Sequence, residues 1–211
     1  MPEHPLLSAL RDLLPKGCGA AWTDPREERE SSPADLSPAA TPSRMREFAA
    51  GRAAARMAMQ DIGVNATSIP SGPDRAPVWP EDILGSITHT TRHCLAAVAP
   101  KGALSGLGID LEEATPLDHG LRDTILLATE QRALMAFPQA DRGLMAKVAF
   151  CAKEAAYKAQ YPTSRTLFGF DAMTVTIEGN HFAARFLHGI PPFAGGHVIE
   201  GRFTLSDDHI L

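Results

Sequence analysis

LGIDLEE at residues 107–113 and FCAKEAAYK at residues 150–158 are the two stretches on which the fold depends. In the first, apolar residues alternate with Gly108, Asp110 and Glu112, a period of two that predicts a strand with both carboxylates on one face. The second is rich in alanine, so we expect a helix on which Glu154 and Lys158, spaced i, i+4, share a face. If the helix crosses the end of the strand, three carboxylates and one ammonium group converge.

Such a cluster suits a hard cation and a phosphate. Mg²⁺ prefers oxygen ligands and keeps waters that a substrate phosphate can displace. The alternative for each pair is a solvated strand end and a salt-bridged helix face, because most charged side chains lie on exposed faces. The surrounding sequence decides between the two.

Composition limits the class of protein. The chain has 211 residues, 44% of them hydrophobic, and a net charge of −5, which argues against a general nucleic-acid binder. The three cysteines, Cys18, Cys94 and Cys151, form no CxxC pair, so we expect reduced thiols in a cytoplasmic protein. No apolar run approaches about 20 residues and the N-terminus does not resemble a signal peptide, so we expect no membrane span.

The order of expected elements indicates an α+β fold with antiparallel strands. Residues 24–43 are rich in proline, serine and charge and predict a loop, and residues 43–63 predict a helix with Ser43 as N-cap and Gly63 as terminator. The prolines of residues 68–80 exclude a helix there. Strands are expected at 83–90, 93–100 and 106–112 and from residue 168 onward, with helices at 119–136 and 143–160.

A weak internal repeat suggests duplication. Residues 48–56 (FAAGRAAAR) align with residues 150–158 (FCAKEAAYK), with the phenylalanine and three alanines identical. We therefore expect a pseudo-twofold duplicated fold, in which two similar halves, 1–103 and 104–211, each contain antiparallel strands and a long helix. The active site would lie in the cleft between them, and the protein would act as a monomer. In that arrangement Glu154 and Lys158 would face Arg52 and Arg56.

Basic residues suited to phosphate accompany the acids. Arginine binds phosphate through a planar fork and lysine through a point charge. Joined to the three acids, they could hold a polyphosphate and its metal. The set comprises Arg44, Arg46, Arg52, Arg56, Arg75, His89 and Lys158.

The motifs GRAAAR, DRAPVWP, GSITH, GIDLEE and FCAKEAAYKA, in that order, closely resemble those of the 4′-phosphopantetheinyl transferases, and most of all their enterobactin-synthetase-activating branch. The resemblance runs from about residue 44 to about residue 171. Such enzymes move the phosphopantetheine arm of coenzyme A onto a serine of a carrier protein and release adenosine 3′,5′-bisphosphate.

The resemblance implies a role for each matching residue. The two acids of the GIDxE motif and the glutamate of the KEAxxK motif, here Asp110, Glu112 and Glu154, would bind Mg²⁺, and Lys158 would contact the pyrophosphate. The first half would supply the contacts to adenosine and phosphates, from Arg52, Arg75, Thr88 and His89. Thr88 stands where the family usually has serine and keeps a hydroxyl. Phe150 and Cys151 replace the usual tryptophan and serine at positions expected to pack.

Other readings stay open at this point. One is a carrier-protein or nucleotide-binding protein of the same fold without chemistry, although all three metal carboxylates are present. Another is a different Mg²⁺-dependent phosphoryl or nucleotidyl transferase, although no GxxxxGK[ST] loop occurs. For a transferase, the base that accepts the serine proton is Glu154, or Glu112 through a water. The partners would be coenzyme A and acyl, peptidyl or aryl carrier domains, with an exposed part of residues 121–137 as the docking patch.

Overall fold

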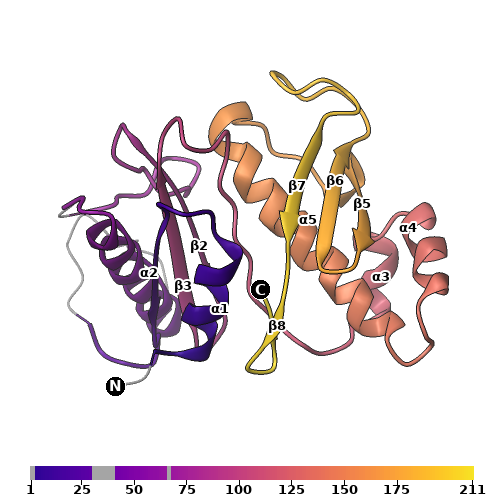
Figure 1. The fold of residues 1–211 in the computed structure, drawn as a ribbon, viewed down its shortest axis with the longest axis horizontal. Helices are drawn as coiled ribbons and strands as arrows, with labels where there is room; N and C mark the ends of the chain where they lie inside the picture. The colour runs from indigo at the N-terminus through magenta and orange to yellow at the C-terminus, as the bar shows by residue number, and fades with distance from the viewer. Residues whose placement is uncertain (1–2, 30–40, 66–67) are drawn as a thin grey trace. The chain divides into compact units, whose positions relative to one another are not determined.

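A computed structural model describes residues 3–29, 41–65 and 68–211 of the chain. The chain divides into two compact units, Met1–Leu111 and Glu112–Leu211, which can be followed by colour in Figure 1. Each unit contains helices and antiparallel strands. The α+β class expected from the sequence is therefore confirmed.

The first unit is a three-stranded antiparallel sheet with a long helix. Its elements are α1 (Pro5–Leu13), β1 (Gly19–Thr23), α2 (Pro42–Asp61), β2 (Ile83–His89) and β3 (Cys94–Pro100), and the strand order is β1-β3-β2. Small residues let α2 approach the sheet closely: a side chain at Gly19 would meet the Ala58 carbonyl oxygen at 2.0 Å, and one at Gly51 would meet Ile87 at 3.1 Å. The alanine-rich sequence of α2 thus serves packing as well as helix propensity.

The predicted start of α2 is wrong by two residues. Thr41, not Ser43, is the N-cap, and its side chain accepts a hydrogen bond from the Arg44 amide. Pro42 then occupies the first helical position, where its missing N–H costs nothing and its fixed φ suits the helix. The helix ends before Gly63, whose φ of +76° is as expected of a terminator. Residues 30–40 of the expected loop lie outside the described residues.

The predicted hairpin of the first unit is confirmed. β2 and β3 pair in antiparallel register from Ile83 opposite Pro100 to His89 opposite Cys94. The hydroxyl of Thr90 accepts from the amides of Arg92 and His93 in the turn between them. As predicted, the described residues of 68–80 contain no helix.

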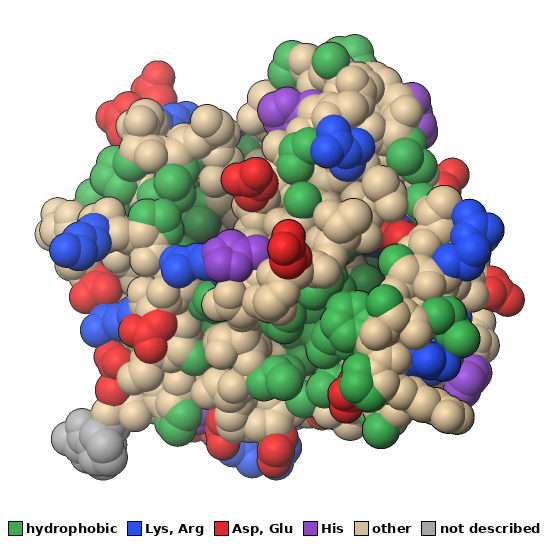
Figure 2. Space-filling model, turned by 45° about the vertical axis from the view of Figure 1, so that its right-hand side comes forward, with side chains coloured by type: hydrophobic (Ala, Val, Ile, Leu, Met, Phe, Trp, Pro, Cys, Tyr) green, Lys and Arg blue, Asp and Glu red, His purple; other side chains and the backbone are tan. Residues whose placement is uncertain are grey.

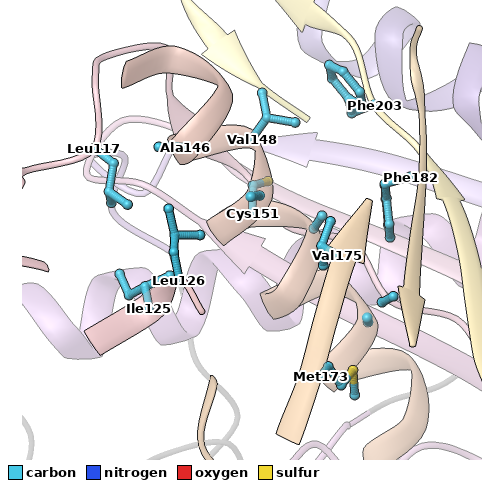
Figure 3. Packing of buried hydrophobic residues seen from close by; sticks show 14 of the residues in the cluster. Leu117, Ile125, Leu126, Ala146, Val148, Cys151, Met173, Val175, Phe182 and Phe203 are labelled. Carbon is cyan, nitrogen blue, oxygen red and sulfur yellow. The ribbon is translucent and has the colours of Figure 1, made fainter. Parts of the chain in front are cut away.

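The second unit contains two small antiparallel sheets and the longest helix. Its core gathers apolar side chains of α5 and the β5–β6 hairpin, among them Val148, Cys151, Val175 and Phe182 (Figure 3). The strand orders are β5-β6-β7 and β4-β9-β8. The elements are β4 (Glu112–Glu113), α3 (His119–Ile125), α4 (Ala128–Ala133), η2 (Leu134–Ala136), α5 (Arg142–Ser164), η3 (Phe170–Ala172), β5 (Met173–Glu178), β6 (His181–Phe186), β7 (Val198–Arg202), β8 (Leu205–Ser206) and β9 (His209–Ile210).

Two predicted elements of this region differ. The helical stretch 119–136 is interrupted at Leu126 and Leu127, because the Glu130 carboxylate accepts the Leu127 amide at 2.7 Å and starts a new helix. The strand expected at 106–112 is also wrong. Only Glu112 and Glu113 pair, with β9, because the Ile109 and Leu111 amides donate to side-chain hydroxyls instead of a neighbouring backbone.

The two units repeat one motif, a long helix followed by an antiparallel hairpin. In the first unit α2 precedes β2 and β3, and in the second α5 precedes β5 and β6. The third strand comes from opposite directions along the chain: β1 precedes its helix, and β7 follows its hairpin. The repeated residues 48–56 and 150–158 lie within α2 and α5. The pseudo-twofold relation itself stays a prediction.

Candidate active site

Asp110 lies at the end of the first unit and is buried, with 7% of its surface exposed. The Thr88 hydroxyl of β2 donates to Asp110 Oδ1 at 3.1 Å and accepts from the Leu111 amide, also at 3.1 Å. Two residues earlier on the same strand, Ser86 Oγ accepts from the Ile109 amide at 3.0 Å. Side-chain hydroxyls of β2 therefore fix the backbone on both sides of the first predicted metal ligand.

Glu112 begins the second unit and is held by a lysine. It pairs with Ile210 in the β4–β9 ladder, and Lys147 Nζ of α5 lies 2.8 Å from its Oε2. The sequence reasoning missed Lys147, although its i, i+7 spacing to Glu154 places both on one face of α5. The next residue, Glu113, is exposed.

Glu154 and Lys158 lie one turn apart on α5 and are both partly buried, as the i, i+4 spacing predicts. Beside Glu154 is a pocket of about 230 Å³ in the second unit. Aromatic and aliphatic side chains predominate in its wall. The wall is formed by Lys153, Glu154, Tyr157, Phe168, Gly169, Phe170 and Met173.

The sequence reasoning also missed a buried ion pair next to Glu154. Lys153 Nζ lies 2.8 Å from Glu130 Oε2, with side chains only 2% and 3% exposed. The same ammonium donates to the carbonyl oxygens of Ile125 and Phe170. Glu130 Oε1 accepts from the Val175 amide at 2.6 Å. Burial lowers the pKa of Lys153, and the neighbouring Glu130 carboxylate opposes that shift.

This ion pair and its hydrogen bonds connect five elements of the second unit. Lys153 comes from α5 and Glu130 from α4, and their partners lie at the end of α3, in η3 and in β5. Glu130 and Lys153 are 23 positions apart in the sequence, so no local pattern indicates that they pair. A buried lysine in a KEA motif can be recognised only once its partner is placed.

In the first unit the predicted phosphate-binding residues occupy three settings. Arg52 of α2 is 5% exposed, donates to Ser71 Oγ at 3.1 Å and lies over the Phe48 ring at 4.4 Å. Arg56, one turn later, is partly buried. Arg75 is exposed in the loop before β2, with a left-handed φ of 65°. A non-glycine residue in that region is strained, a feature that concentrates at functional sites.

His89 ends β2 beside two charged residues of α2. Arg44 Nη1 lies 2.9 Å from His89 Nε2, and because arginine only donates, Nε2 must be the acceptor. The proton of the neutral ring is then on Nδ1, which lies 3.9 Å from Glu47 Oε2. Arg44 is also paired with Glu47 at 3.2 Å. Basic and acidic side chains are similarly interspersed over the face shown in Figure 2.

The three predicted metal ligands belong to different units: Asp110 to the first, Glu112 and Glu154 to the second. Within residues 3–29, 41–65 and 68–211, no group of three or more acidic, histidine or cysteine side chains could hold a metal ion. The donor chemistry nevertheless fits a hard divalent cation, because all three are carboxylates and hydrogen bonding already orients Asp110.

Carboxylates accompanied by arginine, lysine and histidine make an enzyme that acts on a phosphate ester or anhydride the candidate class. Comparison with known proteins narrows the class. Residues 32–99 match the model of the 4′-phosphopantetheinyl transferase N-terminal domain, and residues 106–204 match that of the 4′-phosphopantetheinyl transferase superfamily.

Individual relatives agree. The chain is 33% identical to the 4′-phosphopantetheinyl transferase Npt of Nocardia iowensis, over 96% of this chain and 97% of the relative. It is 34% identical to PptT of Mycobacterium tuberculosis, over 80% and 77% of the two chains. Enterobactin synthase component D of Salmonella typhimurium is 35% identical over 72% of this chain and 62% of its own length.

The chain belongs to the 4′-phosphopantetheinyl transferase superfamily. It is an enzyme that transfers 4′-phosphopantetheine from coenzyme A to carrier proteins, in the branch that includes these relatives. In the part of the chain that the structure describes, no helix has the length and apolar character needed to cross a membrane.

Proposed function

We propose that the transfer depends on Mg²⁺ and that Asp110, Glu112 and Glu154 hold the ion. The observation that carries this proposal is the setting of the first two acids. Asp110 is buried and oriented by the Thr88 hydroxyl, and Glu112, two residues later, is held by Lys147. Carboxylate oxygens are the ligands that a hard divalent cation such as Mg²⁺ prefers, and hydrogen-bond partners fix their orientation. When bound, the ion would neutralise charge on the pyrophosphate of coenzyme A.

The reacting bonds assign roles to two side chains of α5. The carrier serine oxygen forms a bond to the β-phosphorus of coenzyme A, and the bond to adenosine 3′,5′-bisphosphate breaks. Glu154 accepts the serine proton, or Glu112 does so through a water. Lys158, one turn from Glu154, stabilises the charge on the non-bridging pyrophosphate oxygens.

The first unit would bind the nucleotide end of coenzyme A. Arg52, Arg56 and Arg75 would supply positive charge and hydrogen-bond donors for the phosphates, and His89, beside Thr88, would supply the N–H of its ring. The 1–103 half would thus serve coenzyme A and the 104–211 half the metal and the phosphoryl transfer.

The pocket beside Glu154 would receive the pantetheine arm. Coenzyme A continues from its pyrophosphate into an extended, largely aliphatic arm. The pocket walls, with Phe168, Phe170 and Met173, provide apolar surface next to the residue assigned to the reacting phosphate. Its volume of about 230 Å³ is too small for the whole of coenzyme A but suits part of a narrow chain.

The carriers would be acyl, peptidyl or aryl carrier domains in the cytoplasm. The relatives named as enterobactin synthase component D favour a role in siderophore or other nonribosomal peptide synthesis. In the expected docking segment, Leu121 and Met135 are 50% and 61% exposed, whereas Ile125, Leu126 and Leu134 are core. The exposed pair would contact the carrier, and the enzyme would act as a monomer.

Mass spectrometry of a carrier tests the function directly. The full chain is incubated with coenzyme A, Mg²⁺ and an apo-carrier whose serine can be replaced by alanine. The carrier should gain the mass of one phosphopantetheine arm, and neither the alanine carrier nor a reaction in EDTA should gain it. Transfer that persists in EDTA would contradict the role of Mg²⁺, and no transfer to acyl, peptidyl or aryl carriers would favour a binding protein.

Arg75→Ala and His89→Ala should raise the KM for coenzyme A about 10–150-fold each and leave kcat less affected, because losing one charge-assisted contact to a phosphate removes about 1.5–3 kcal/mol of binding. Initial rates at varied coenzyme A and saturating carrier measure the effect. Arg26→Ala, which removes an exposed arginine paired with Asp24, is the matched control. A change confined to kcat would contradict the binding role.

A further inference from the structure

The two faces of β2 carry different parts of the site. Side chains alternate along a strand, so the consecutive residues Thr88 and His89 point to opposite faces. His89 lies against Arg44 and Glu47 of α2. Thr88 shares the other face with Ser86, and both of these hydroxyl side chains are 4% exposed. Thr88 is therefore turned away from the basic residues that surround its neighbour.

The Thr88 hydroxyl donates one hydrogen bond and accepts another. A hydroxyl has one proton and two lone pairs. The proton goes to Asp110 Oδ1 and a lone pair receives the Leu111 amide, at 3.1 Å in each case. The bonds join the same oxygen to the carboxylate and to the backbone immediately after it. Asp110 is thereby held by its side chain and its main chain at once.

Ser86 of β2 makes a similar hydrogen bond to the residue before Asp110. Ser86 Oγ accepts a hydrogen bond from the Ile109 amide at 3.0 Å. The amides of the residues before and after Asp110 therefore both donate to hydroxyls on one face of β2. Residues 106–111 form no regular strand. The two hydroxyls therefore take the place of ladder hydrogen bonds and set the position from which Asp110 projects.

We propose that Thr88 is a positioning residue for the metal ligand Asp110 and does not itself bind the phosphates of coenzyme A. This inference rests on the proposed function, in which Asp110 holds Mg²⁺. Hydrogen-bond partners of a metal ligand fix its orientation, and losing one costs about 10–100-fold in metal affinity. Thr88 is such a partner, because its hydroxyl oxygen bonds both the Asp110 carboxylate and the Leu111 amide.

The test separates metal affinity from coenzyme A affinity in the full-length chain. Binding of coenzyme A is measured by calorimetry in EDTA and then at increasing Mn²⁺, and the Mn²⁺ concentration that gives half of the enhancement is recorded. Thr88→Val keeps the shape and removes the hydroxyl. That Mn²⁺ concentration should rise about 10–100-fold, while coenzyme A affinity in EDTA should stay the same. Thr88→Ser should restore the wild-type value.

Two further variants locate the effect. Ser86→Ala removes the other hydroxyl but leaves the donor to Asp110, so its effect on the Mn²⁺ concentration should be smaller than that of Thr88→Val. Circular dichroism and the melting temperature check that each variant folds. If Thr88→Val is unfolded, Thr88→Cys, a weaker donor, is measured and should shift the Mn²⁺ concentration in the same direction.

Three outcomes would overturn the inference or its premise, and they differ. An unchanged Mn²⁺ concentration in folded Thr88→Val would refute the positioning role. Weaker coenzyme A binding in EDTA would make Thr88 a direct ligand. Asp110→Asn is measured alongside: if it too leaves the Mn²⁺ dependence unchanged, or the wild type shows none, the metal assignment of the proposed function fails.

Discussion

Glu130→Ala is expected to lower the free energy of unfolding of the second unit by about 3–5 kcal/mol, because removing one partner of a buried ion pair leaves the other charge uncompensated. Lys153 would keep its two carbonyl acceptors, Ile125 and Phe170, but lose the carboxylate that lies 2.8 Å away. Asp171 also raises the pKa of Lys153, but its effect is smaller than that of Glu130. The amides of Leu127 and Val175 would lose their acceptors as well. Urea unfolding followed by far-UV circular dichroism measures the change.

A double variant shows whether the loss comes from the unpaired charge. Burial lowers the pKa of Lys153 despite its partner, so the environment disfavours the charged form. Replacing both charges, as in Glu130→Leu with Lys153→Met, should therefore recover a substantial part of the stability lost in Glu130→Ala. Glu113→Ala, at an exposed glutamate of the same unit, is the control and should change little. A Glu130→Ala variant as stable as the wild type would refute the account.

The elements that the sequence predicted correctly carry local signals. α5 and α2 are long and rich in alanine, and Gly63 ends α2 in the left-handed conformation that glycine tolerates. The hairpin of β2 and β3 is bounded by proline-rich and polar turns. In each case the cause of the structure lies within a few residues of the element itself.

The segment before Glu112 shows why alternation alone was insufficient. Period-two alternation describes which side chains face the core, but a strand also requires backbone partners. Here the amides of Ile109 and Leu111 find their acceptors in Ser86 and Thr88, more than 20 residues earlier. Nothing in residues 106–112 reveals those partners. The same limit hid the pairing of Lys153 with Glu130.

The sequence predicted the spacing of side chains in the candidate site but not their partners. The spacing of Glu154 and Lys158 on α5 was correct, because helix geometry alone decides it. The partners of the acids, Lys147 for Glu112 and Thr88 for Asp110, required the fold. The motifs therefore name the candidate reactive groups, and the structure adds the residues that hold two of them, Asp110 and Glu112, in place.

Glu154→Gln is expected to lower kcat by at least about 10²–10⁴-fold, the usual contribution of a general base. Glutamine has nearly the shape of glutamate but neither accepts a proton at neutral pH nor offers the metal a charged oxygen. Because Glu154 is only partly buried on the α5 surface, the melting temperature should change little. Single-turnover assays with an apo-carrier follow the carrier's mass against time. They measure the rate constant of the chemical step, free of product release.

Comparison with Glu112→Gln decides which acid accepts the serine proton. If Glu154 is the base, Glu154→Gln should slow the chemical step even at Mg²⁺ concentrations that restore metal binding, whereas excess Mg²⁺ should largely rescue Glu112→Gln. If a Glu112-bound water is the base, the two variants should exchange these behaviours. A Glu154→Gln enzyme that modifies carrier at the wild-type rate would eliminate Glu154 as base. Lys153, immediately before Glu154, is anchored to Glu130, and both residues line the pocket. Adjacent residues of α5 would therefore have different roles, with Lys153 stabilising the fold and Glu154 taking part in the reaction.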